Sequence, residues 1–183
     1  YSTVLIDGVT TNPSLMLKAG KDPREVLKEI SDIFPFHASV SAEVIGDSVE
    51  EMLEMADDYI EIGPNITIKV PLTPEGLKVC KDLSTDDVAV NVTLCFSTAQ
   101  AILAAKAGAT YVSPFVGRVN DQSFDGIKLI EEISDVYATH KQKTQVLAAS
   151  IRDVYQVASC FRVGADICTI PSKIFSGMYK HIL

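Results

Sequence analysis

The sequence lacks the residue patterns that usually hold metal ions. It has only three histidines, which are scattered, and its four cysteines show no metal-type spacing. Cys95 and Cys168 fall in strand-like segments, whereas Cys80 and Cys160 fall on apolar, helix-like ones. We therefore expect four buried free thiols in a reducing cytosol, and no metal site.

Long runs of one charge, or of apolar residues, are also missing. With 24 acidic and 16 basic side chains the formal charge is −8, which argues against a nucleic-acid surface or an anionic membrane as a partner. No stretch is long and apolar enough to span a bilayer, and no signal peptide is visible. We expect a cytoplasmic protein. An anionic small substrate remains possible if a local basic pocket offsets the overall field.

Linkers, low-complexity tracts and shifts of composition are absent as well. A chain of 183 residues with 47% hydrophobic content can bury one sizeable core. We predict one domain over residues 1–183.

The sequence does contain an alternation of short apolar strands with amphipathic helices, which predicts a parallel sheet covered by helices. The expected strands are Val4–Thr11, His37–Val44, Asn65–Val70, Val88–Leu94, Thr110–Val116, Thr144–Ser150 and Asp166–Ile170. The expected helices are Pro13–Ala19, Pro23–Ile33, Asp47–Ile62, Pro74–Leu83, Ser97–Ala107, Phe124–Tyr137, Asp153–Val163 and Ser172–Ile182. Gly63, Gly108 and Gly164 follow three of these helices and are expected to cap them in the left-handed conformation.

Two α/β architectures fit seven strands that are each followed by a helix. One is an open doubly wound sheet, and the other is an eight-stranded (β/α) barrel with seven strands visible here. The open sheet would be favoured by a glycine-rich phosphate loop, but neither a G-x-G-x-x-G motif nor a P-loop is present.

The alternation of side chains along the strands favours the barrel. In each strand one face is aliphatic, and the other becomes polar towards the carboxyl end. In a barrel the second faces point inward, and their ends meet at the mouth where active sites form. The residues expected around this cavity are Asn12, Glu43, Lys69, Asn91, Thr93, Ser113 and Ser150, with Arg118 and Arg152 just beyond two strand ends as an anion site.

Lys69 lies in a run of β-branched residues, where an ammonium group is costly to bury unless it is paired. An edge strand is one explanation, because lysine there discourages association between sheets. The other is an amine that attacks a carbonyl and forms a Schiff base.

Every other candidate also has a plain alternative. Asn12 precedes Pro13 and could be only a turn or cap residue, and Glu43 could be a partly exposed acid. Asn91 and Thr93 could be a satisfied polar pair, and the two arginines could be solvated. Ser113 and Ser150, taken alone, do not distinguish a functional site from an ordinary strand end. The shared parity and shared strand end of seven such residues favour a functional site.

These residues lie in motifs that resemble those of the small transaldolases and fructose-6-phosphate aldolases. The resemblance runs from Gly8 to about His181. The motifs that carry it are Gly8–Ser14, Ile68–Thr73 with Glu75–Leu77, Asn91–Leu94, Tyr111–Arg118 and Leu147–Arg152.

The resemblance implies a (β/α)8 barrel that needs no metal and no organic cofactor. Lys69 matches the lysine that forms the Schiff base with a ketose, and Glu43 the acid that activates a water together with the threonine at Thr93. The resemblance also implies two groups of substrate-binding positions. Asn12, Asn91 and Ser113 match residues that hold the dihydroxyacetone hydroxyls, and Arg118, Ser150 and Arg152 match those that bind the sugar phosphate.

Two positions distinguish the activities within this family. The aldolases carry glutamine at the position of Glu43 and tyrosine at that of Phe115, so this chain has the transaldolase pair, and Ser113 agrees with it. The implied reaction transfers a dihydroxyacetone unit from fructose 6-phosphate or sedoheptulose 7-phosphate to an aldose phosphate, in the pentose phosphate pathway. A fructose-6-phosphate aldolase and a non-catalytic sugar-phosphate-binding barrel are the alternatives.

The resemblance also implies segments beyond this sequence. Family members carry a first strand with a catalytic aspartate ahead of the motif at Gly8, and a final helix. Asp7 directly precedes Gly8 and does not correspond to that aspartate. We therefore expect a domain truncated at both ends. Small members of the family are often homo-oligomers, pentamers or decamers.

Overall fold

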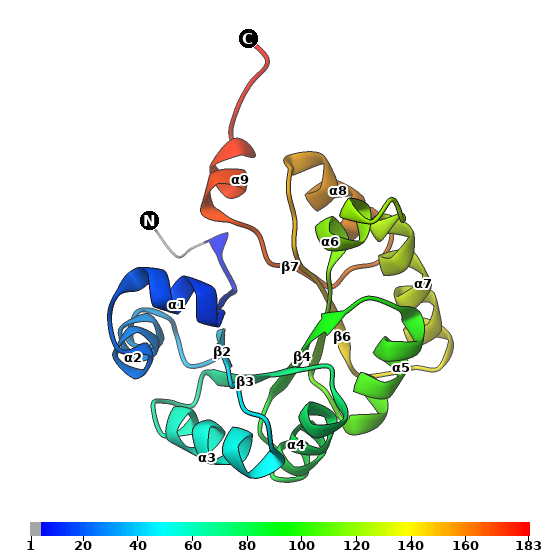
Figure 1. Cartoon of the computed structure of the whole chain (residues 1–183). Helices are drawn as coiled ribbons and strands as arrows, with labels where there is room; N and C mark the ends of the chain where they lie inside the picture. The colour runs from blue at the N-terminus through cyan, green and yellow to red at the C-terminus, as the bar shows by residue number, and fades with distance from the viewer. Residues whose placement is uncertain (1–4) are drawn as a thin grey trace. The chain divides into compact units, whose positions relative to one another are not determined.

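Parallel strands alternate with helices throughout residues 5–183, the part of the chain that the computed structural model describes (Figure 1). The contacts group the chain into two compact units, Tyr1–Val92 and Thr93–Leu183. The boundary lies inside strand β4 (Val90–Cys95).

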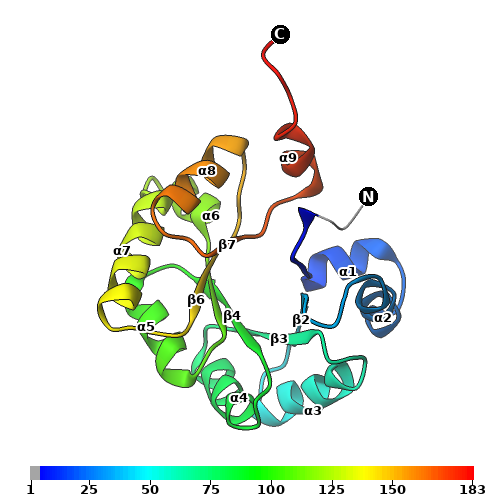
Figure 2. The same ribbon diagram turned by 180° about the vertical axis from the view of Figure 1, so that it is seen from behind.

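The first unit is a strand–helix repeat with its strands hydrogen-bonded in sequence order, β1 to β4. Glu43 pairs with Lys69 in the parallel register of β2 and β3. Helix α2 packs on β2. Helices α3 and α4 both pack on β3, and they lie on the same side of β3 in both views (Figures 1 and 2). The elements are β1 (Gly8–Thr10), α1 (Pro13–Ala19), α2 (Pro23–Ile33), β2 (Ser39–Glu43), α3 (Val49–Ile60), β3 (Ile66–Pro71), α4 (Pro74–Thr85) and the start of β4.

The aliphatic strand faces of this unit form its core. Val40, Ile68 and Val70 are fully buried, as are Met52 on α3 and Val79 on α4. Removing such side chains from water is the main favourable term in folding. The opposite face of the same strands is therefore left to the polar side chains.

Side-chain caps fix where the helices of this unit begin. Asn12 accepts the Leu15 N–H, Ser48 that of Glu51, and Thr73 that of Gly76, each satisfying a donor that has no partner within its helix. Ser48 is thus the cap of α3, and the predicted start at Asp47 is two residues early.

The second unit continues the repeat, and its strands are ordered β4 to β7. Helix α5 packs on β5, α7 on β6 and α8 on β7. Figure 2 shows α7 and α8 on one side of β6 and β7. The elements are the end of β4, α5 (Thr98–Ala107), β5 (Tyr111–Pro114), α6 (Val116–Asp121), α7 (Gly126–Thr139), β6 (Gln145–Ala148), α8 (Val154–Arg162), β7 (Ile167–Cys168) and α9 (Ser172–Gly177).

Helix α6 was not predicted from the sequence, which favoured a strand up to Val116. The backbone N–H groups of Val116 and Gly117 bind the carbonyls of Ala149 and Ser150. These contacts with the residues just after β6 fix the start of one short helix. Val116 and Val119 are buried one helical turn apart, so tertiary packing overrides their β propensity.

Several other predicted boundaries were wrong. Helix α7 begins at Gly126 because Asp125 caps it, and α9 ends at Gly177 rather than Ile182. Gly108 and Gly164 have the expected positive φ, 92° and 103°. Gly63 does not, because α3 ends at Ile60 with a right-handed cap at Glu61. Val4, the first residue of one predicted strand, lies outside the described residues, and β1 covers only Gly8–Thr10.

The fold class is nonetheless the one expected, an α/β repeat of the (β/α) barrel type with seven parallel strands among residues 5–183. Neither unit reverses its strand order, as a doubly wound sheet would. Within residues 5–183 no helix combines the length and apolarity needed to cross a membrane.

Candidate active site

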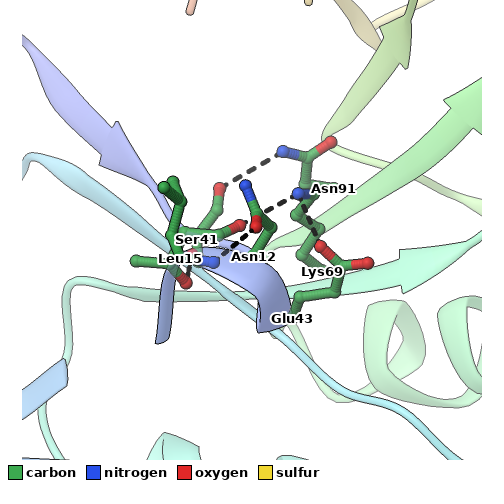
Figure 3. A network of polar contacts seen from close by, with 7 residues as sticks. Asn12, Leu15, Ser41, Glu43, Lys69 and Asn91 are labelled. Carbon is green, nitrogen blue, oxygen red and sulfur yellow. Dashed lines mark hydrogen bonds and ion pairs between the residues drawn. The ribbon is translucent and has the colours of Figure 1, made fainter. Parts of the chain in front are cut away.

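Lys69 and Glu43 form a buried ion pair in the first unit. They occupy paired positions on β3 and β2, and the Nζ of Lys69 donates a hydrogen bond to the Oε2 of Glu43 at 2.7 Å (Figure 3). The strand ladder fixes both backbones, so neither residue can drift from the other. The buried lysine is paired, as the cost of burying a lone ammonium requires.

The amine of Lys69 has a second partner on the loop after β1. Its Nζ donates to the backbone carbonyl of Thr11 at 3.0 Å. Asn12 follows directly, and its Oδ1 accepts the Leu15 N–H at 2.9 Å, so it caps α1. Asn12 is therefore a helix cap, which was one of its two predicted roles. The cap also fixes Asn12 directly after Thr11, whose carbonyl binds Lys69.

Asn91 faces the same side of the sheet as Lys69. It is fully buried on β4, and its Nδ2 donates to the Oγ of Ser41 at 3.2 Å (Figure 3). The Ser41 carbonyl accepts the N–H and the Oγ1–H of Thr11, at 3.0 and 2.8 Å. These contacts connect Asn91 with the loop that also holds Lys69. Ser41 was not among the predicted site residues, although it shares its parity with Glu43.

The remaining predicted residues belong to the second unit. Thr93 is buried on β4, and its Oγ1 has no hydrogen-bond partner among residues 5–183. A buried hydroxyl of this kind is suited to bind water or a ligand group. Leu94, the next residue, adopts a positive φ of 61°, which is strained for a residue with a Cβ.

Ser113 and Phe115 lie at the carboxyl end of β5. Ser113 is buried within the strand. Phe115 comes directly before α6, and its ring packs edge-on against that of Phe96 with the centroids 5.6 Å apart. Phe96 follows β4, and it was not predicted to be near the site.

Ser150 and Arg152 both contact Gly117. The Ser150 carbonyl accepts the Gly117 N–H at 3.0 Å, and the Arg152 side chain lies against the Gly117 Cα. Arg118 is the next residue and is exposed on α6. Arg152 also donates from Nη2 to the Oδ2 of Asp121 at 2.7 Å. No sequence signal pointed to Asp121, because α6 itself was not predicted.

None of the four cysteines forms a disulfide, and three of them are buried, while Cys168 is only partly buried. Burial raises the pKa of the Cys80 and Cys95 thiols to about 12. Residues 5–183 contain no group of three or more His, Cys, Asp or Glu side chains that could hold a metal ion.

Comparison with known proteins gives a consistent assignment. The family described as Transaldolase/Fructose-6-phosphate aldolase matches residues 1–183. A probable transaldolase of Paracoccus denitrificans is 52% identical over 179 residues, which are 98% of this chain and 82% of that protein. One from Cereibacter sphaeroides (strain ATCC 17025) is 51% identical over 98% of this chain and 81% of its own length.

A third relative extends the match to the whole chain. The probable transaldolase of Caulobacter vibrioides is 48% identical over 182 residues, which are 100% of this chain and 83% of that protein. The chain therefore belongs to the transaldolase/fructose-6-phosphate aldolase family.

Proposed function

We propose that this protein is a transaldolase that works through a Schiff base on Lys69. It moves a dihydroxyacetone unit from fructose 6-phosphate or sedoheptulose 7-phosphate to an aldose phosphate. The observation that carries the proposal is the Lys69 amine, which is buried and held between Glu43 and the Thr11 carbonyl. An amine in this setting is suited to covalent catalysis.

The chemistry begins with the proton on Lys69. Glu43 accepts a hydrogen bond from Nζ at 2.7 Å, so it is positioned to take that proton and leave a neutral amine. The amine adds to the C2 carbonyl of the ketose, and loss of water gives a protonated imine. When the C3–C4 bond breaks, its electron pair moves into the imine to form an enamine.

Cleavage also releases the proton of the C4 hydroxyl and an aldose phosphate. The family resemblance assigns this proton to an aspartate on the strand that precedes the Gly8 motif in family members, to which Asp7 does not correspond. The enamine then attacks the aldehyde of the second aldose phosphate, and hydrolysis of the new imine frees Lys69. Glu43, a water and Thr93 form the proton relay in both directions, and the orphaned Oγ1 of Thr93 supports its part in it.

The other predicted residues hold the substrate. Asn12, Asn91 and Ser113 bind the hydroxyls of the dihydroxyacetone unit, supported by the contact network that Asn91 and Thr11 share through Ser41. The phosphate site consists of Arg118, Ser150 and Arg152, supported by the contacts that Ser150 and Arg152 make with Gly117, the residue before Arg118. No metal or organic cofactor takes part.

Phe115 and Glu43 favour transfer over release of free dihydroxyacetone. The family's aldolases have tyrosine and glutamine at these positions. Phe115 has no hydroxyl that could donate a proton to the enamine, and its ring packs against that of Phe96. A fructose-6-phosphate aldolase is therefore the second candidate, and Phe115→Tyr is expected to gain aldolase activity.

Borohydride trapping tests the proposal. Reduction in the presence of fructose 6-phosphate should attach a stable adduct to Lys69, located by peptide mass spectrometry. Absence of the adduct would leave only the non-catalytic sugar-phosphate-binding barrel. Turnover of fructose 6-phosphate that requires erythrose 4-phosphate identifies a transaldolase, whereas release of dihydroxyacetone without an acceptor identifies an aldolase.

The proposal also covers the domain organisation, the oligomeric state and the pathway of the enzyme. We expect one barrel domain, a homo-oligomer of five or ten subunits, and a place in the cytoplasmic pentose phosphate pathway. The family resemblance supports each of these points. Sedimentation velocity measures the assembly directly, and a monomer at micromolar concentration would contradict the expected ring.

A further inference from the structure

The side chain and backbone of Arg152 are held at three points. Its N–H donates to the Oε1 of Gln156 at 2.9 Å, and Gln156 N–H in turn donates to the Asp153 cap of α8. Its Nη2 donates to Asp121 Oδ2 at 2.7 Å. Between these two contacts the side chain crosses Gly117.

Gly117 makes this path possible. A Cβ on it would lie 2.2 Å from the Ser150 carbonyl oxygen and 2.7 Å from the Nε of Arg152. Both distances are far inside van der Waals contact. The absence of a side chain at Gly117 therefore leaves room for the Nε of Arg152, and Asp121 accepts a hydrogen bond from the Nη2 of the same guanidinium.

We infer that Asp121 is a positioning residue for the phosphate site: it holds the Arg152 guanidinium on Gly117, ready to receive the phosphate of the sugar substrate. The inference rests on the proposed function, because it takes the anion at Arg118 and Arg152 to be a sugar phosphate. It adds to that proposal Asp121, the last residue of α6, which had no predicted role.

The hydrogen-bonding capacity of arginine allows Asp121 and a phosphate to be bound together. A guanidinium has five N–H donors, and the contact with Asp121 uses Nη2. The other donors can face the phosphate oxygens without breaking the ion pair. A long side chain that is already ordered loses less entropy when the ligand binds, so the pair strengthens phosphate binding.

An opposite effect is also physically possible. The Asp121 carboxylate is negative, and it would repel a phosphate dianion if its charge were not offset by Arg152. The two effects predict opposite signs when Asp121 is removed. The sign of the change in phosphate affinity is therefore the decisive measurement.

The test uses Asp121→Ala, Asp121→Asn and Asp121→Glu in the intact protein, with kcat and KM measured for erythrose 4-phosphate and for unphosphorylated erythrose. Asp121→Ala should raise the KM of the phosphorylated acceptor about five- to tenfold, with kcat and the KM of erythrose unchanged. Asp121→Asn keeps an acceptor oxygen and should fall between Ala and wild type. Asp121→Glu should restore part of the affinity.

Glu131→Ala is the matched control. Glu131 forms an exposed ion pair with Lys128, also at 2.7 Å, so its removal changes the net charge equally without touching Arg152. The KM of erythrose 4-phosphate should not change in this variant. An equal change of the KM in both variants would show that the effect does not depend on the contact with Arg152 and would overturn the inference.

Two further measurements separate failure of the inference from failure of the proposed function. Trapping of Lys69 with unphosphorylated dihydroxyacetone reports on the Schiff base alone. Calorimetric titration with inorganic phosphate reports on the anion site without turnover. If wild type and Asp121→Ala bind phosphate equally, if Asp121→Ala binds it more tightly, or if neither binds it, the positioning role is wrong whatever the trapping shows.

Discussion

Two ion pairs of the same length occupy very different surroundings in the two units. Lys69–Glu43 and Arg152–Asp121 both have N···O distances of 2.7 Å. The side chains of the first pair are 9% and 14% exposed, and those of the second are 50% and 46% exposed. The first pair joins two neighbouring strands, whereas the second joins a strand-end loop to the last residue of α6.

The difference shows that distance alone does not indicate what an ion pair does. The buried pair costs desolvation and is held in place by a strand ladder, so it suits a group that must react in one orientation. The exposed pair contributes little to stability and is open to solvent and ions. It suits a charged substrate group that must enter and leave.

The largest difference between the pairs is expected when the lysine of the first pair and the arginine of the second are replaced in separate variants. Lys69→Met should lower kcat by about 10⁴-fold or more with every substrate, because no nucleophile remains. Arg152→Met should instead raise the KM of phosphorylated sugars by about 10- to 100-fold, the worth of a charge-assisted hydrogen bond. Steady-state kinetics with erythrose 4-phosphate and erythrose measure both.

Lys78, exposed on α4, provides the control for the lysine variant. Lys78→Met should leave kcat and KM at their wild-type values. If Lys69→Met retains more than a small part of the wild-type kcat, the covalent role of Lys69 is excluded.

Stability should distinguish the two pairs next. Glu43→Leu leaves a buried ammonium without its carboxylate and should lower the free energy of unfolding by about 3–5 kcal/mol. Asp121→Leu leaves no buried charge without a partner, because the Arg152 side chain is half exposed. It should lower the free energy of unfolding by about 1 kcal/mol or less. Urea denaturation compares the two variants, and adding Lys69→Met to Glu43→Leu should recover part of the loss. Equal losses in the two single variants would contradict the comparison.

The buried pair was open to prediction from sequence, and the exposed one was not. Strand geometry has a fixed period of two, so Glu43, Lys69 and Asn91 fall on one face once the strands are located. Sequence-ordered parallel strands then bring Glu43 opposite Lys69, as the register confirms. The local pattern and the simple topology were enough.

The contact of Asp121 with Arg152 depends on features that no local pattern carries. The two residues are 31 positions apart, and α6 is only six residues long with valines at its first and fourth positions. That composition favours a strand, but the carbonyls of Ala149 and Ser150, just after β6, bind the N–H groups of Val116 and Gly117 at the start of the helix. Asn12 is a third case, because the sequence around it is equally compatible with a helix cap and with a site residue.

Buried thiols offer a comparison of the two cores that is independent of the ion pairs. Burial raises the pKa of Cys80 in the first unit and of Cys95 in the second to about 12. In the unfolded chain these thiols ionise near pH 9, so their contribution is complete below that pH. Stability should then fall between about pH 9 and 12, by about 1.4 kcal/mol per pH unit for each thiol.

Cys80→Ala and Cys95→Ala isolate this effect from other groups that titrate at high pH. Each variant should lose less stability than wild type between pH 8 and 10, as measured by urea denaturation at both values. A wild-type pH dependence in Cys80→Ala, together with a reduced one in Cys95→Ala, would mean that only the second unit keeps its thiol out of water.

Salt should have the smallest effect, and it should act on one pair only. The Debye length shortens from about 10 Å at 0.1 M to about 3 Å at 1 M, which screens exposed charges far more than buried ones. Raising potassium chloride over this range should increase the KM of erythrose 4-phosphate by about fivefold, because Arg118 and Arg152 are exposed. The rate at which borohydride and dihydroxyacetone label Lys69 should stay constant, since Glu43 and Thr11 hold its amine away from the salt. A labelling rate that falls in parallel with phosphate affinity would mean that the buried pair is also open to ions, and the contrast between the two pairs would not hold.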